Sequence, residues 1–292
     1  MQNTIGMIGL GIMGGAMARN LRHAGFNVVG FDLDATAVAA AKAAGVEVAA
    51  SAAAVAETAQ DILVSLPNAK AVQQTATAIA ASHAKARTVI ETSTLSLADK
   101  TAFGDVLTSA GHLALDCPLS GTGAQARTKD LVVFASGDTN AIKRLEPVFL
   151  GFARKTFDLG PYGNGSKMKF VANLLVAIHN VAAGEALVLA MKAGLDPEQV
   201  IEAVGAGAGN SRVFELRAPM MAANCYVPAT MRSRTWKKDM TVIGDFASGL
   251  DCPTPLFTAT RPLYDAALAM GRDGEDVAAV CAVLEAMAGM QR

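Results

Sequence analysis

Residues 4–32, TIGMIGLGIMGGAMARNLRHAGFNVVGFD, decide the fold of this chain. The stretch opens with a short apolar run, residues 4–10, which has the composition of a buried strand and ends in glycines. Residues 16–23 then have the pattern of a helix, and a second apolar run, Asn27–Phe31, leads to Asp32. A strand, a helix and a second strand in this order predict a parallel βαβ unit.

The turn between the first strand and the helix carries a G-x-G-x-x-G motif, made of Gly9, Leu10, Gly11, Ile12, Met13 and Gly14. Gly9 permits the tight turn, Gly11 leaves room for a pyrophosphate at the helix N-terminus, and Gly14 lets the helix pack closely on the strand. We therefore expect these six residues to bind a dinucleotide. The alternative is a glycine turn with a purely structural use in an unrelated βαβ unit.

An acidic residue, Asp32, ends the second strand 18 residues after Gly14. At this position of the motif a carboxylate accepts hydrogen bonds from the ribose hydroxyls of an adenosine. Asp34 follows two residues later and no arginine is near, so the 2′-phosphate of NADP would be repelled. The sequence therefore predicts NAD as the cofactor in preference to NADP.

Strands and helices continue to alternate through the first half of the chain. Apolar runs predict further strands at residues 61–66, 88–91, 112–115, 131–135 and 155–157. We expect all of them to complete one doubly wound, mostly parallel Rossmann sheet, which makes this half an α/β domain.

Ligands of such sheets bind beyond the carboxyl ends of the strands. The loops expected there contain Leu66, Pro67 and Thr94, which we predict to face the cofactor, and the segment 120–123. The alternative for Thr94 and its neighbour Ser93 is an ordinary turn or capping role.

The pattern changes after residue 163, where no convincing strand follows and helices predominate. We therefore predict an α/β domain at residues 1–163 and an all-α domain at 164–292. The longest apolar run, residues 166–193, has no proline and predicts a largely buried helix, about 40 Å long, that joins the two domains. Lys169 lies in its first turns, with Asn173 one turn further on the same face. Taken alone, Lys169 could equally be a surface lysine whose ammonium reaches solvent.

Composition excludes several classes of protein. With 292 residues, of which 52% are hydrophobic, the chain can bury a large core, and a net charge of −1 gives no electrostatic case for nucleic-acid binding. Charged residues within the long helix, including Glu185, argue against a membrane span. The N-terminus lacks the basic region and the length of a signal peptide. Four scattered cysteines without a C-x-x-C pair indicate reduced thiols, no metal site and a cytoplasmic protein.

Four segments occur in the order found in a known enzyme family: 9–21 (GLGIMGGAMARNL), 116–121 (DCPLSG), 163–173 (GNGSKMKFVAN), and Lys238-Asp239 followed by Pro255 and Tyr264. Together they make essentially the whole chain resemble the β-hydroxyacid dehydrogenases, which include 3-hydroxyisobutyrate dehydrogenase and tartronate semialdehyde reductase. The resemblance implies hydride transfer between NAD and the hydroxyl-bearing carbon of a small 3-hydroxy acid. It also implies that Lys169 is the catalytic acid and base, that Asn173 positions the substrate, and that Lys238 lies near the cofactor or substrate.

The same resemblance implies that the Ser120 hydroxyl and the backbone amides of Gly121 and Thr122 hold the substrate carboxylate. The sequence departs from the family here, because Thr122 stands where a second glycine is usual, and Gln125 and Lys129 replace a glycine-rich continuation. These departures surround the substrate rather than the cofactor. The reaction class therefore transfers to this chain, whereas the identity of the substrate does not.

Two other functions fit the same residues. One is a semialdehyde or imine reductase on the same scaffold, for which the altered segment 122–129 leaves room. The other is a non-catalytic dinucleotide-binding protein whose helical half serves only to dimerise. The apolar helical half also predicts a homodimer or homotetramer.

Overall fold

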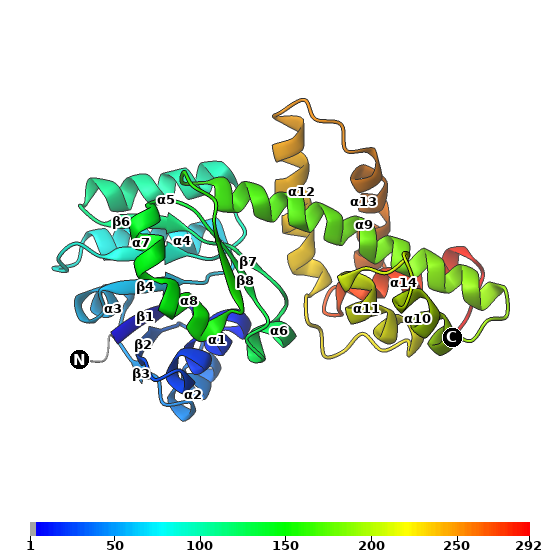
Figure 1. Cartoon of the computed structure of the whole chain (residues 1–292), viewed down its shortest axis with the longest axis horizontal. Coiled ribbons are helices and arrows are strands. Elements are labelled where there is room, and N and C mark those ends of the chain that lie inside the picture. The colour runs from blue at the N-terminus through cyan, green and yellow to red at the C-terminus, as the bar shows by residue number, and fades with distance from the viewer. Residues whose placement is uncertain (1–3) are drawn as a thin grey trace. The chain divides into compact units, whose positions relative to one another are not determined.

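The computed structural model describes residues 4–292, and the chain divides into two compact units, one ending at Lys169 and the other Phe170–Arg292 (Figure 1). The predicted α/β fold with an all-α C-terminal part is confirmed. The domain boundary placed at residue 163 remains a prediction.

The first unit is built on a six-stranded sheet with the order β3-β2-β1-β4-β5-β6. Its strands are β1 (Thr4–Ile8), β2 (Asn27–Phe31), β3 (Glu47–Val48), β4 (Asp61–Val64), β5 (Thr88–Glu91) and β6 (Leu113–Asp116). Every neighbouring pair is parallel. The strand order reverses between β1 and β4, and ligands of doubly wound sheets bind at such a reversal.

Helices cover both faces of this sheet. The first five are α1 (Ile12–His23), α2 (Ala35–Ala43), α3 (Ala52–Thr58), α4 (Ala69–Ala80) and α5 (Leu97–Ser109). Side chains of β1 alternate between two apolar clusters: Met7 packs with Met17 of α1 on one face, and Ile8 packs with Val55 and Phe103 on the other. This alternation follows from the two-residue period of a strand, and it explains why the strands are apolar throughout.

The prediction that residues 131–135 and 155–157 belong to the main sheet is wrong. They form a second sheet of three strands, in the order β7 (Leu119–Ser120), β8 (Val132–Ala135) and β9 (Lys155–Asp158). β7 is antiparallel to β8, and β8 is parallel to β9. Pro118 follows β6 closely and has no N–H to continue a ladder, so the chain turns there. A single bridge, between Asp116 and Ser136, pairs the backbone at the end of β6 with the backbone that follows β8.

Three short helices connect the strands of the second sheet. α6 (Gly123–Arg127) lies between β7 and β8, and α7 (Thr139–Arg144) and α8 (Glu146–Phe152) lie between β8 and β9. Apolar side chains of α8, Phe149 and Phe152 among them, join the cluster formed around α1.

The second unit is helical, and within the described residues 170–292 the only strand-like pairing is an isolated bridge between Arg232 and Asp276. Its helices are α9 (Asn164–Lys192), α10 (Pro197–Gly205), α11 (Arg212–Ala222), α12 (Ser233–Ser248), α13 (Pro255–Ala269) and α14 (Val280–Met287), with a 3₁₀ turn, η1 (Val277–Ala279). α9 begins in the first unit and continues through the second. By length and hydropathy alone α9 could cross a membrane, a test that the core helix of a soluble protein also passes. Buried residues along α9, such as Ala177, Val181 and Leu187, identify it as the core helix of this unit.

Candidate active site

The glycine turn between β1 and α1 is shaped for close backbone approach. Gly9 has φ +90, and a Cβ on it would lie 2.1 Å from the carbonyl oxygen of Ser65. A Cβ on Gly14 would lie 1.9 Å from the carbonyl oxygen of Gly9, so only glycine at position 14 lets the helix approach the turn this closely. Gly11, in contrast, faces open space within 4 Å and begins α1 without a side-chain cap. The first amides of α1 therefore have room for an anion, as a bound dinucleotide requires.

The carboxylate of Asp32 ties the end of β2 to this turn. Its Oδ2 accepts a hydrogen bond from the Leu10 N–H at 2.6 Å, and its Oδ1 accepts one from the Asp34 N–H at 2.8 Å. A carboxylate has about four acceptor positions, so these bonds leave capacity for ribose hydroxyls. The structure thus brings Asp32 and the glycine turn together, as predicted from their spacing.

The loops after β4 and β5 lie at the same edge of the sheet. The Leu66 N–H donates to Ser93 Oγ at 3.0 Å, and the Thr92 hydroxyl donates to the Val64 carbonyl at 2.8 Å. Pro67 is the residue after Leu66 in the first of these loops, and Thr94 is the residue after Ser93 in the second. Ser93 therefore has a structural role, the alternative considered for it from sequence.

The segment predicted to hold the substrate carboxylate has an unexpected internal bond. Ser120 ends β7, and Gly121 has φ +134, a conformation that favours glycine. The Thr122 N–H donates to Gln125 Oε1 at 3.0 Å, and Gln125 Nε2 donates to Asp130 Oδ2 at 3.0 Å. One of the two amides predicted to hold the carboxylate thus already has an acceptor. Sequence analysis missed helix α6, although a threonine followed three residues later by a glutamine is a helix-start signal.

The first turn of α9 is fixed to the first unit. The Gly165 N–H donates to Ser136 Oγ at 2.9 Å, and the Ser166 N–H donates to Asp116 Oδ2 at 2.8 Å. A Cβ on Gly165 would lie 2.3 Å from the carbonyl oxygen of Phe134, so glycine allows this approach. Lys169 lies one turn further along and is only 6% exposed. The turn that precedes Lys169 is therefore held by residues at the ends of strands β6 and β8.

Within the second unit, Asp239 connects two of the predicted site residues. Asn173, which is 4% exposed, donates from Nδ2 to Asp239 Oδ2 at 3.1 Å. Lys238 Nζ lies 3.3 Å from Asp239 Oδ1. Asp239 appeared in the sequence only as part of the Lys238-Asp239 family pattern and was not predicted as a site residue. Its position directly after Lys238 was the one signal that could have indicated a role in the site.

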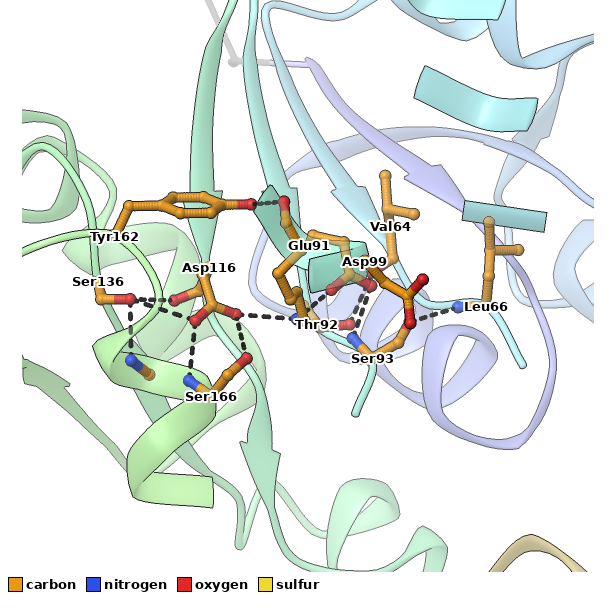
Figure 2. A network of polar contacts seen from close by, with 12 residues as sticks. Val64, Leu66, Glu91, Thr92, Ser93, Asp99, Asp116, Ser136, Tyr162 and Ser166 are labelled. Atoms are coloured by element: carbon orange, nitrogen blue, oxygen red, sulfur yellow. Dashed lines mark hydrogen bonds and ion pairs between the residues drawn. The ribbon is translucent and has the colours of Figure 1, made fainter. Parts of the chain in front are cut away.

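A buried charge cluster contains the carboxylates of Glu91 and Asp116 (Figure 2). Glu91 bonds to the loop after β5, and Asp116 bonds to the first turn of α9. Lys100 of α5 pairs with Glu91, and its Nζ lies 2.8 Å from Asp116 Oδ1. All three side chains are fully buried. Burial by itself lowers the pKa of Lys100, but the charges of Asp116 and Glu91 outweigh it and raise that pKa above its ordinary value. The cluster was not predicted from the sequence, because its members lie on two strands and a helix and share no periodic pattern.

The fold and the open glycine turn define the first unit as one of the dinucleotide-binding class. Residues 4–160 match the NAD binding domain of 6-phosphogluconate dehydrogenase. Residues 163–284 match the family described as "NAD-binding of NADP-dependent 3-hydroxyisobutyrate dehydrogenase". The chain is 33% identical to L-threonate dehydrogenase of Cupriavidus necator, over 96% of this chain and 95% of that protein.

Two solved structures have the same architecture. The 3-hydroxyisobutyrate dehydrogenase of Salmonella typhimurium is 31% identical, with a TM-score of 0.86 over 97% of this chain and 100% of the other. That of Mycobacterium tuberculosis, solved with L-serine, is 30% identical, with a TM-score of 0.86 over 97% of this chain and 99% of the other. The chain belongs to the β-hydroxyacid dehydrogenase family, which confirms the resemblance found in the sequence. It is an NAD(P)-binding oxidoreductase whose relatives act on small hydroxy acids.

Proposed function

We propose that this protein transfers hydride between NAD and the hydroxyl-bearing carbon of a small 3-hydroxy acid similar to 3-hydroxyisobutyrate, with Lys169 as the general acid and base. The observation that carries the proposal is the buried Lys169 on a turn that is bonded to the dinucleotide-binding unit. L-serine, present in the related Mycobacterium tuberculosis structure, is itself a 3-hydroxy acid.

The bound nicotinamide supplies the chemistry of hydride acceptance and donation. In the oxidative direction the neutral amine of Lys169 accepts the substrate's hydroxyl proton, and in the reductive direction the ammonium returns it. Burial of an amine in general favours the neutral form, which is the form that can accept a proton. The Asn173 amide positions the substrate, and Asp239 fixes that amide by accepting its hydrogen bond.

The substrate carboxylate is proposed to bind at the Ser120 hydroxyl and at the amides of Gly121 and Thr122. Because the Thr122 N–H already donates to Gln125, the carboxylate must share or replace that acceptor. A second candidate is a semialdehyde or imine reductase on the same scaffold. The bond between Thr122 and Gln125 favours the imine reductase, because it reduces the donors available to a carboxylate, which a semialdehyde carries and an imine need not.

The cofactor is proposed to lie along the glycine turn, over the residues Gly9, Leu10, Gly11, Ile12, Met13 and Gly14. Asp32 would accept from the ribose hydroxyls, Leu66, Pro67 and Thr94 would line the adenosine or nicotinamide side, and Lys238 would approach the cofactor. The family includes NADP-dependent members, so the preference for NAD is an inference from the Asp32 carboxylate of this chain.

A homodimer or homotetramer in the cytoplasm is proposed as the working form. Support comes from exposed apolar residues on α9 of the second unit, including Val171 at 55% and Leu189 at 72% exposure. A monomer by light scattering coupled to gel filtration would count against the oligomer.

A substrate screen tests the proposed reaction. The purified protein is incubated with 3-hydroxyisobutyrate, L-threonate, L-serine, semialdehydes and a cyclic imine, with NAD(H) and NADP(H) in parallel. The proposal expects NADH absorbance with at least one 3-hydroxy acid. Reduction of a semialdehyde that carries a carboxylate is the proposed reaction in the reductive direction and would also support it. Activity confined to imines would favour an imine reductase, and dinucleotide binding without any turnover would favour a non-catalytic protein.

A further inference from the structure

The centre of the buried charge cluster is an ammonium between two carboxylates. Lys100 pairs with Glu91 on one side and lies 2.8 Å from Asp116 Oδ1 on the other, with all three side chains fully buried. Buried ion pairs of this kind are often no more stabilising than apolar side chains of similar size, because desolvation offsets their attraction. Global stability is therefore a weak explanation for the cluster, and the groups attached to its two ends are more informative.

One end of the cluster holds the loops at the carboxyl edge of the sheet. Glu91 Oε1 accepts a hydrogen bond from the Ser93 N–H at 2.8 Å, and Ser93 Oγ in turn accepts one from the Leu66 N–H at 3.0 Å. The backbone of the loop after β4 is thus bonded through Ser93 to the Glu91 carboxylate (Figure 2).

The other end holds the start of α9. Asp116 accepts from Ser166 twice, with Oδ2 taking the N–H at 2.8 Å and Oδ1 taking the hydroxyl at 2.9 Å. A carboxylate here also offsets the positive end of the helix dipole. Ser166 precedes Lys169 by three residues on the same helix, so a shift of this turn moves the Lys169 backbone with it. Figure 2 shows the bonds that join Asp116 to Ser166 and to Ser136.

We propose that Lys100 is a positioning residue. Through Glu91 and Asp116 it couples the loop after β4, which contains Leu66, to the first turn of α9. Binding of the dinucleotide at that loop then orders the turn that carries Lys169. The importance of this coupling for catalysis rests on the proposed role of Lys169, but the coupling itself can be measured without substrate.

The test uses hydrogen–deuterium exchange of the full chain with and without saturating NADH. In the wild-type protein, NADH is expected to slow exchange in the peptide covering residues 164–170. The double variant Glu91→Gln/Lys100→Met removes one negative and one positive charge, so the cluster keeps its net charge. It also keeps an acceptor for Ser93 and leaves the bonds between Asp116 and Ser166. We expect this variant to bind NADH within about threefold of wild type and to lose the NADH-induced protection of 164–170.

The matched control is Asp61→Asn/Arg144→Met, which removes an ion pair with a 2.7 Å contact elsewhere in the same unit. It should retain the protection of residues 164–170. Protection that persists in the Lys100 double variant would overturn the proposal, as would the absence of NADH-induced protection in the wild-type protein.

If the double variant does not fold, Ser166→Ala provides a milder cut at the other end, because it removes only the hydroxyl bond to Asp116. The proposal then expects NADH-induced protection reduced by at least about threefold, and unchanged protection overturns it. None of these results depends on turnover, so they remain distinct from a failure of the proposed reaction. Where a substrate is found, the double variant should also lower kcat by about tenfold, with the KM for NAD little changed.

Discussion

Replacing Asp32 with Asn tests the cofactor preference at a single functional group. The Asp32 carboxylate accepts from the Leu10 N–H at 2.6 Å and from the Asp34 N–H at 2.8 Å, so it belongs both to the fold of the turn and to the proposed ribose site. Asn keeps the shape and one acceptor oxygen but removes the charge. We expect weaker use of NAD and improved use of NADP by the same variant.

The expected size of the effect follows from the charge that is removed. Two unit charges about 4 Å apart repel by about 1 kcal/mol in water and about 4 kcal/mol at the surface of a protein. The Asp32 side chain is half-buried, so removing its charge should relieve a 2′-phosphate of roughly 1–3 kcal/mol, a change of about 5- to 150-fold in relative preference. Losing one backbone hydrogen bond should lower the free energy of unfolding by only about 1 kcal/mol.

The assay compares kcat/KM for NAD and for NADP in the wild-type protein and in Asp32→Asn, with the same hydroxy acid. Asp34→Asn is the matched control, because Asp34 is exposed and its carboxylate caps α2 by accepting from Thr36. The control should change the ratio much less. A wild-type protein that prefers NADP by tenfold, or a ratio unchanged in Asp32→Asn, would refute the reasoning.

Three further predictions follow from particular contacts. Gly165→Ala should lower the free energy of unfolding by about 1–3 kcal/mol in urea, because its Cβ would lie 2.3 Å from the Phe134 carbonyl oxygen; an unchanged midpoint would contradict this. Gln125→Ala should lower the KM for the acid a few-fold, because it releases the Thr122 N–H that Gln125 occupies, and a raised KM would argue against a carboxylate at that amide. Burial raises the pKa of the Cys117 thiol, so the folded thiol stays protonated while the unfolded one ionises above about pH 9. The free energy of unfolding should therefore fall as pH rises from there, by at most about 1.4 kcal/mol per pH unit, and Cys117→Ala should show a shallower fall; an equal slope would contradict the assignment.

Five of the six strands of the main sheet could be predicted from the sequence, because their apolar runs are local signals. The edge strand β3 (Glu47–Val48) was not predicted, since two residues make too short a run to stand out. The glycine turn and the apolar runs are each read from a few consecutive residues, and Asp32 is marked by its position at the end of the second strand. The second sheet could not be predicted in the same way. β8 and β9 are apolar runs like the others, and only the turn at Pro118 and the antiparallel return from β7 separate them from the main sheet.

The candidate site divides along the same line. Lys169 and Asn173 are predicted as site residues because helical spacing and the family motif both mark them, and their roles remain predictions. Lys100 was not found, since a lysine within an ordinary helix pattern predicts a solvated side chain, and its two partners come from strands β5 and β6. Long-range pairing of charges leaves no periodic trace in a sequence, so only the structure shows it.

The most direct test of the account is turnover by Lys169→Ala, measured together with NADH binding. The control is Lys167→Ala, which changes an exposed lysine of the same turn that bonds to Asn164 Oδ1 at 3.1 Å. The account predicts that Lys169→Ala loses about two orders of magnitude or more in kcat while NADH binding and the Lys167→Ala activity stay close to wild type. Turnover near the wild-type value in Lys169→Ala would contradict the central claim.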